Sequence, residues 1–333
     1  MFVMERETLI SQKMRALSPE LDPLRIGTGW SPEDLSKPQV FIESTFGDSH
    51  PGSGHLDSLV EKVREGVRDA GGYGARYFCT DMCDGESQGT DGINYSLASR
   101  EMIANMIEIQ ANATPFDAGV YIASCDKGIP GNLIGMMRVN IPSIFVAGGT
   151  MNAGPELLTL EQLGKYSAQY ERGEIGEECL DAVLHHRVQR GDAVLIRYEG
   201  PRGSGMPEMF YTSEAISSDQ ELGRSIALIT DGRFSGASTG PVIGHCSPEA
   251  ADGGPIALVE EGDLIEIDVE KRALNIVGVK GERKSPEEIA LALRARRAAW
   301  KPKQKKYKAG VLRLFSEHAA SPMKGAYLEY DDE

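Results

Sequence analysis

Cysteine and positive charge are both scarce in this chain of 333 residues. Its five cysteines are an odd number spread along the chain, so the sequence predicts neither a disulfide framework nor the two close cysteine pairs of a zinc ribbon. Lysine and arginine number 35 against 50 acidic residues, which gives a formal charge of −15. Because nucleic acids and anionic membranes are polyanions, this charge argues against both as partners.

Long apolar segments are also missing. No run approaches the length of a membrane span, and the first ten residues, MFVMERETLI, lack the apolar core of a signal peptide. The rest of the composition is ordinary for a soluble globular protein, with 41% apolar and 26% charged residues. The length suffices for one large domain or two smaller ones. We therefore expect a cytoplasmic protein without a membrane partner.

Apolar runs and helical spacings alternate through residues 1–187. The runs predict buried strands at Val40–Ser44, Val120–Ser124 and Ser143–Ala147. The segments with helical spacing are His55–Ala70, a stretch from about Ser96, and Gly131–Asn140. Strands separated by helices imply parallel pairing. Residues 1–187 are therefore predicted to form an N-terminal α/β domain with a parallel sheet.

The pattern changes after about residue 188. Strand-like runs follow at Ala193–Tyr198 and Ile226–Thr230, and two alternating segments flank the turn Glu270–Arg272 as in a hairpin. Residues 188–300 are therefore predicted to form a β-rich, barrel-like C-terminal domain. Residues 301–333 are predicted to be a tail that packs back on the body, and their basic beginning is interpreted as a solvated connector rather than an anion site.

The tripeptide Cys125-Asp126-Lys127 is the most informative feature of the chain. It stands where a predicted strand ends and a predicted helix begins. A thiol, a carboxylate and an amine rarely crowd the end of a buried strand unless a metal or a substrate binds there. The carboxyl end of a parallel strand is also where α/β folds place their ligands. This turn therefore predicts an enzyme site.

Three further segments carry candidate site residues. Asp84 follows Cys83 in a loop that leads to a helix, Glu208 lies in a turn shaped by glycine and proline, and Ser235 follows a strand end among small residues. Asp84, Asp126 and Glu208 could together bind Mg²⁺, which prefers oxygen ligands. Taken singly, each of these residues is weak evidence, since an Asp-Gly pair such as Asp84-Gly85 is more typical of a simple turn.

Taken together, these segments resemble a known family, the dihydroxy-acid and sugar-acid dehydratases. The resemblance is carried by CDKGIPGNLIGMMRVNIPSIFVAGG and by LITDGRFSGASTGPVIGHCSPEAADGGPIALVEEGD. Three other stretches are most similar to the D-xylonate dehydratase branch of that family: ESTFGDSHPGSGHLD, DGINYSLASREMIANMIEIQANATPFDAG and VLRLFSEHAASPMKGAY. The resemblance covers nearly the whole chain.

The resemblance implies a hydro-lyase that removes water from D-xylonate or a similar sugar acid to give a 2-keto-3-deoxy acid. It implies an iron–sulfur cluster of the 2Fe-2S or 4Fe-4S type, held by three cysteines, beside a Mg²⁺ ion. Cys125 matches a cluster ligand, Asp84, Asp126 and Glu208 match the Mg²⁺ ligands, and Ser235 matches the base. Lys127 matches a lysine that is carbamylated in the family and adds an oxygen ligand.

The sequence departs from the family at the cluster. The first cluster cysteine would fall near Gly52, and Cys83 is the natural substitute in the xylonate branch. The third cysteine belongs to a segment that this chain lacks. We infer that a large central block is missing, which leaves both domains incomplete. Cys179 lies near the join and is the possible replacement for the third ligand.

Two other functions stay open on this sequence. One is a catalytically inactive family member that acts as an interaction protein. The other is a protein that binds a sugar acid through Mg²⁺ without turnover, because the candidate Mg²⁺ ligands are all retained. We expect a homo-oligomer in each case, since an incomplete domain exposes apolar surface that needs cover.

Overall fold

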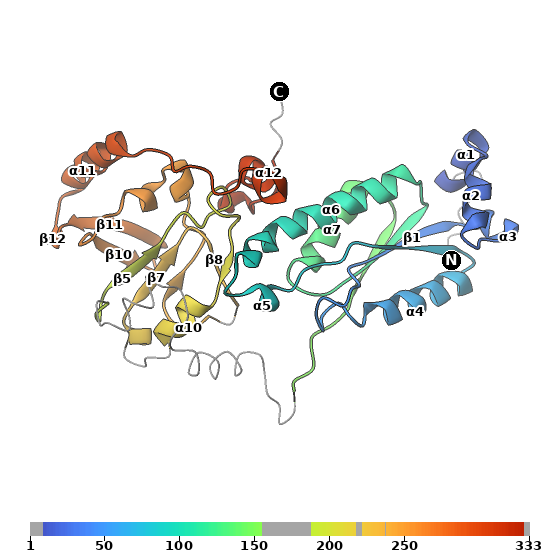
Figure 1. Ribbon diagram of the computed structural model, residues 1–333, viewed down its shortest axis with the longest axis horizontal. Helices are drawn as coiled ribbons and strands as arrows, with labels where there is room; N and C mark the ends of the chain where they lie inside the picture. Colours follow the sequence, from blue (N-terminus) through green and yellow to red (C-terminus); the bar gives the residue numbers. More distant parts are fainter. Residues whose placement is uncertain (1–8, 155–187, 218–221, 237, 330–333) are drawn as a thin grey trace. The chain divides into compact units, whose positions relative to one another are not determined.

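Figure 1 shows the computed structural model, which describes residues 9–154, 188–217, 222–236 and 238–329. The chain divides into two compact units, each made of two stretches of sequence. Unit 1 comprises Met1–Cys83 and Ser99–Asn152, and unit 2 comprises Asp84–Ala98 and Ala153–Glu333. The predicted boundary at residue 187 and the candidate ligand Cys179 lie outside the described residues.

A parallel sheet of four strands forms the centre of unit 1. The strands are β1 (Gln39–Ser44), β2 (Tyr73–Phe78), β3 (Ala118–Ala123) and β4 (Ser143–Ala147). Their order is β2-β1-β3-β4 and all three pairings are parallel. The predicted α/β fold with a parallel sheet is confirmed, and β2 is a strand that the sequence did not predict.

Helices cover both faces of this sheet (Figure 1). On one face lies α4 (Leu56–Asp69), whose Leu56 and Val60 pack on Ile42 of β1. On the other face lie α6 (Tyr95–Ala113) and α7 (Gly128–Val139), with Ile107 packed near Phe41. Phe41 and Ile42 point to opposite faces because side chains alternate along a strand. Each fully buried aliphatic side chain of this kind stabilises the fold by roughly 1.5–3 kcal/mol.

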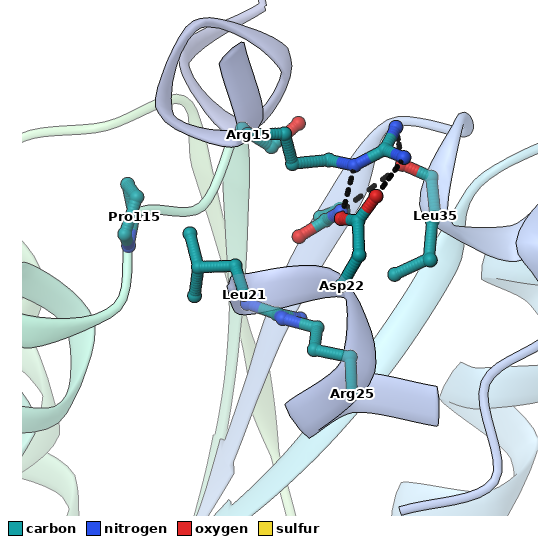
Figure 2. A pocket seen from close by; sticks show the side chains of 8 residues that line it. Arg15, Leu21, Asp22, Arg25, Leu35 and Pro115 are labelled. Atoms are coloured by element: carbon teal, nitrogen blue, oxygen red, sulfur yellow. Dashed lines mark hydrogen bonds and ion pairs between the residues drawn. The ribbon is translucent and has the colours of Figure 1, made fainter. Parts of the chain in front are cut away.

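Three short helices precede the sheet: α1 (Ile10–Leu17), α2 (Leu21–Gly27) and α3 (Pro32–Leu35). Asp117 ties α1 to the start of β1, since its carboxylate accepts hydrogen bonds from Ser11 N, Ser11 Oγ and Gln39 N. Figure 2 shows the small pocket beside these helices, where Arg15 of α1 donates two hydrogen bonds to Asp22 of α2. These contacts fix the helices at the amino ends of the strands.

Unit 2 is rich in short strands that form three small sheets. One contains β5 (Ala193–Ile196), β7 (Ala227–Thr230) and β9 (Val242–Ile243) in parallel, and another pairs β6 (Glu208–Met209) with β8 (Arg233–Phe234). The third is the antiparallel set β10 (Leu264–Asp268), β11 (Ala273–Val279) and β12 (Glu282–Arg283). The predicted hairpin corresponds to β10 and β11, so the β-rich second half is confirmed.

In the described part of unit 2 lie the helices α5 (Asp84–Ser87), α10 (Tyr211–Ser217), α11 (Pro286–Ala299) and α12 (Gly310–His318). Ser285 and Glu288 form a capping box that starts α11. Tyr307 Oη donates a hydrogen bond to Ser204 O at 3.0 Å, and Phe315 of α12 is fully buried. Among the described helices of the chain, none combines the length and apolar character needed to cross a bilayer.

Candidate functional site

The turn Cys125–Lys127 connects β3 to α7 in unit 1. Cys125 has a left-handed backbone with φ 65°, and Lys127 is the N-cap residue of α7. Lys127 is 2% exposed, and its Nζ pairs with the half-exposed carboxylate of Asp126. The three side chains therefore stand at the carboxyl end of a parallel strand, where the sequence predicts a ligand site.

Two side chains that were not predicted from the sequence converge on Cys125. A ring nitrogen of His50, a carboxylate oxygen of Asp81 and Sγ of Cys125 all lie within 4.8 Å of one another. His50 follows β1, Asp81 follows β2 and Cys125 follows β3. Because these strands are neighbours and parallel, the sheet brings three distant segments together at one edge.

His50 and Asp81 form a buried hydrogen-bonded pair. His50 Nε2 lies 2.9 Å from Asp81 Oδ1, and Gly52 N–H donates to His50 Nδ1 at 3.0 Å. Because Nδ1 accepts a hydrogen bond, the proton of the neutral ring is on Nε2 and is donated to Asp81. Burial raises the pKa of the Asp81 carboxyl, against the opposing effect of His50. Burial, followed by the charges of Asp126 and Asp81, raises the pKa of the Cys125 thiol to about 12.

Unit 2 contains a close pair of carboxylates. Asp84 is the first residue of α5 and Glu208 is the first residue of β6. One oxygen of Asp84 lies within 4.8 Å of one oxygen of Glu208. Two carboxylate oxygens at this separation suit a hard cation such as Mg²⁺. Asp126, the third predicted Mg²⁺ ligand, belongs to unit 1.

Ser235 directly follows β8, the strand that pairs with the strand of Glu208. In this parallel pair Glu208 is opposite Arg233, and Ser235 N–H donates to Met209 O at 3.0 Å. Ser235 is partly buried. The main chain at Ser235 is therefore held by the same small sheet that carries Glu208.

Asp231, between β7 and Ser235, has a structural role. It is 0% exposed. Its carboxylate accepts hydrogen bonds from Tyr198 N at 3.1 Å, Glu199 N at 2.9 Å and Ala250 N at 2.7 Å. These bonds join three segments of unit 2 at the end of β7, so both oxygens of Asp231 serve the fold.

The donor atoms near Cys125 do not fit a cluster held by three cysteines. Among the described residues, the group of ligand atoms around Cys125 contains His50 and Asp81 and no second cysteine. Cys83 is partly buried in unit 1 and is not in that group. Thiolates are the usual ligands of iron–sulfur clusters. The oxygen donors of Asp84 and Glu208, by contrast, fit Mg²⁺.

Two family models match the chain. The model described as dihydroxy-acid/6-phosphogluconate dehydratase N-terminal matches residues 37–191, and the corresponding C-terminal model matches residues 169–326. The chain is also similar to curated proteins of the same kind. A dihydroxy-acid dehydratase of Ignicoccus hospitalis is 25% identical over 556 residues, which span 94% of this chain and 99% of the relative.

Two other relatives have the same name. A dihydroxy-acid dehydratase of Pyrococcus abyssi is 26% identical over 537 residues, spanning 90% of this chain and 95% of the relative. One from Oleidesulfovibrio alaskensis is 25% identical over 540 residues, with the same two shares of 90% and 95%. All three aligned spans are longer than the 333 residues of this chain.

Proposed function

Because the chain belongs to the dihydroxy-acid/6-phosphogluconate dehydratase family in both its N-terminal and its C-terminal parts, we propose that it is a sugar-acid dehydratase. It removes water from D-xylonate or a similar aldonic acid and releases a 2-keto-3-deoxy acid. The hydro-lyase class rests on the family. The choice of a sugar acid rests on the three segments that resemble the D-xylonate branch.

The proximity of Asp84 and Glu208 is the observation that carries this proposal. Their oxygens, within 4.8 Å of one another in unit 2, offer a divalent cation two anionic ligands. The proposed Mg²⁺ site adds Asp126 and, after carbamylation, Lys127. Bound Mg²⁺ supplies a Lewis acid for the carboxylate end of the substrate. The carboxylates of this chain hold the ion and offset its charge.

Ser235 is the proposed base of the reaction. In the proposed step its oxygen takes the proton from C2 of the sugar acid, the C3–O bond breaks, and the leaving hydroxyl takes that same proton from Ser235 to become water. The resulting enol becomes the 2-keto acid by moving a proton to C3. A serine hydroxyl is a weak base unless a neighbouring cation or base activates it. The place of Ser235 beside the strand of Glu208 supports its role.

A second function, Mg²⁺-dependent binding of a sugar acid without turnover, is favoured by the donor set around Cys125. That set does not fit a three-cysteine cluster, and no step is assigned to one. The long aligned spans support the related proposal that a central block, with its cysteine segment, is absent here. The roles of Cys83 and Cys179 as cluster ligands and the homo-oligomer stay predictions, and sedimentation would test the oligomer.

One experiment separates the two functions. The purified chain is titrated with D-xylonate with and without Mg²⁺, and 2-keto acid product is measured in the same anaerobic samples. Dehydration predicts Mg²⁺-dependent binding together with product. Binding alone predicts a saturable heat of binding without product.

A matched pair of variants tests the assignment to the Asp84–Glu208 pair. Asp84→Asn should weaken Mg²⁺-dependent binding by roughly tenfold to 100-fold, because it removes one anionic ligand. Asp91→Asn, a change in an exposed aspartate of the same unit, should leave binding unchanged. The sugar-acid proposal would be contradicted if D-xylonate gave no binding and no product. A strong preference for a short branched dihydroxy acid would also contradict it.

A further inference from the structure

The edge of the unit 1 sheet presents three different metal-binding atoms to one point. His50 contributes a ring nitrogen, Asp81 a carboxylate oxygen and Cys125 a sulfur, all within 4.8 Å of one another. We propose that His50, Asp81 and Cys125 bind a single Zn²⁺ or Fe²⁺ ion. Its three ligands differ from those of the proposed Mg²⁺ site, although Cys125 Sγ donates to Asp126 Oδ1 at 3.3 Å, and its test is independent of the dehydration.

The separation of the three atoms favours one ion over a cluster. Ligands at about 2.0–2.3 Å from a tetrahedral ion lie roughly 3–4 Å from one another. The three atoms lie within 4.8 Å of one another, with His50 Nε2 and Asp81 Oδ1 at 2.9 Å, so side-chain movements would complete the site. An iron–sulfur cluster takes no more than two protein ligands on any one of its irons. Three atoms that converge on one point therefore suit a mononuclear site.

The burial of Asp81 is a second, independent indication that a cation binds here. Asp81 is 4% exposed and His50 is 8% exposed. Asp81 Oδ1 is bonded to His50, but Asp81 Oδ2 is buried and has no hydrogen-bond partner among the described residues. An unsatisfied buried carboxylate oxygen costs stability unless a water or an ion completes its bonding. A cation beside Asp81 removes that cost.

Gly52 provides the space that His50 occupies. A Cβ atom at residue 52 would lie 2.7 Å from both Cε1 and Nδ1 of the His50 ring and 4.0 Å from Cys125 Cβ. Any other residue at 52 would therefore displace the ring. The absence of a side chain at 52 lets the imidazole lie against Cys125.

Ion binding changes the protons of the site in a defined way. His50 Nε2 now shares its proton with Asp81, and Nδ1 accepts from Gly52 N–H. Binding of an ion by Nε2 would require the ring proton to move to Nδ1, which would then no longer accept from Gly52 N–H. Glycine tolerates a backbone change at this amide better than other residues. The thiol proton of Cys125 is released to solvent.

The mixture of donors selects the metal. Nitrogen, carboxylate and thiolate ligands together suit Zn²⁺ and Fe²⁺, which are softer than Mg²⁺. Mg²⁺ prefers oxygen ligands and retains its waters. Three protein ligands also leave a fourth position for water or another small ligand.

The test is a metal titration of the full-length chain. Chelator-treated protein is titrated with Zn²⁺ and, without oxygen, with Fe²⁺, and bound metal and acid-labile sulfide are counted. The proposal predicts one ion per chain and no sulfide. Titration with Co²⁺ should produce a thiolate-to-cobalt charge-transfer band. Sulfide together with two or more irons would instead show a cluster and overturn the proposal.

Two matched cysteine variants sharpen the result. Cys125→Ser should weaken Zn²⁺ binding by roughly 100-fold or more and abolish the cobalt band. Cys246→Ser, a change in a partly buried cysteine of unit 2, should retain both. Loss of both in Cys246→Ser, or full binding in a folded Cys125→Ser, would overturn the proposal. If Cys125→Ser does not fold, Asp81→Asn replaces it. The cobalt spectrum of the unaltered protein then tests the role of Cys125, because absence of the charge-transfer band would overturn the proposal.

Discussion

The same dipeptide, Thr-Asp, stands at the carboxyl end of a parallel strand in each unit, but the two aspartates are bonded differently. In unit 2, Asp231 accepts three main-chain hydrogen bonds, and both of its carboxylate oxygens have a partner. In unit 1, Asp81 receives one hydrogen bond from His50, and its second oxygen has no partner among the described residues. A fully bonded carboxylate fixes the fold, whereas an incompletely bonded one can still bind an ion.

The largest expected effect comes from exchanging each of these aspartates for asparagine. In Asp231→Asn, an amide NH₂ replaces an oxygen that accepts main-chain N–H groups, so donors face donors. We expect a loss of about 3 kcal/mol in the free energy of unfolding of unit 2. In metal-free Asp81→Asn, the amide oxygen still accepts from His50, and we expect a loss below about 1 kcal/mol.

Urea denaturation of both variants checks this prediction. Equal losses would contradict the contrast between the two aspartates. The two variants should rank in the opposite order for Zn²⁺ affinity. Asp81→Asn should lower the affinity, and a folded Asp231→Asn should leave it unchanged.

The next effect concerns buried acids and pH. Burial raises the pKa of Glu43 in β1 to about 8, from 4.5 when exposed. Between these values the folded chain holds a proton that the unfolded chain releases, so stability falls as pH rises from about 4.5 to about 8. The expected loss is a few kcal/mol for unit 1. Glu43→Gln should remove this slope in denaturation experiments between pH 5 and pH 8.

Glu249 gives the corresponding measurement in unit 2. Burial raises its pKa to about 7, opposed by hydrogen bonds from the main chain of Arg202 and Gly203. The contribution of Glu249 to the free energy of unfolding should be lost over the narrower pH range from about 4.5 to about 7. An unchanged pH slope in both Glu43→Gln and Glu249→Gln would show that other groups govern the pH dependence.

A smaller effect is expected from two glycines in one loop. Gly52→Ala brings a Cβ to 2.7 Å from the His50 ring, whereas Gly54→Ala meets nothing closer than His50 O at 3.5 Å. Gly52→Ala should therefore cost about 1–3 kcal/mol of stability and weaken Zn²⁺ binding. Gly54→Ala should change the free energy of unfolding by less than about 1 kcal/mol. Calorimetric melting of the two variants distinguishes these outcomes.

The smallest effect compares one two-pronged arginine pair in each unit. Arg296 binds Asp263 with side chains 11% and 1% exposed, and Arg15 binds Asp22 with side chains 23% and 30% exposed. Lysine cannot reproduce two parallel hydrogen bonds. We expect a loss of about 1 kcal/mol for Arg296→Lys and about 0.5 kcal/mol for Arg15→Lys, because solvent screens the more exposed pair. A larger loss at Arg15 in urea denaturation would contradict this order.

Much of the fold could be predicted because apolar periodicity is a local property. The predicted strand Ser143–Ala147 has the bounds of β4, and the predicted helix His55–Ala70 contains α4. The strand β2 escaped prediction because it lies at the edge of the sheet, is partly exposed and contains Gly74 and Arg76. Its apolar signal is therefore weak.

The site was only partly predictable because its residues meet through the sheet. Cys125 stood out by its immediate neighbours, but His50 and Asp81 have no local motif. A signal existed in the polar pair Thr80-Asp81, which would have pointed to a strand end had β2 been recognised. The strand order that places His50 beside Asp81 depends on pairings between distant segments, which spacing along the chain does not reveal.

The composition of unit 2 from two separated stretches has a consequence for synthesis on the ribosome. Ser96, in the early stretch, accepts a hydrogen bond from Arg233, which is 137 residues further along the chain. At about 5–20 residues per second, that partner emerges roughly 7 to 27 seconds later. During this interval residues 84–98 lack their packing partners while the later strands of unit 1 are still being made. Unit 2 therefore cannot complete its fold before all of unit 1 has been synthesised.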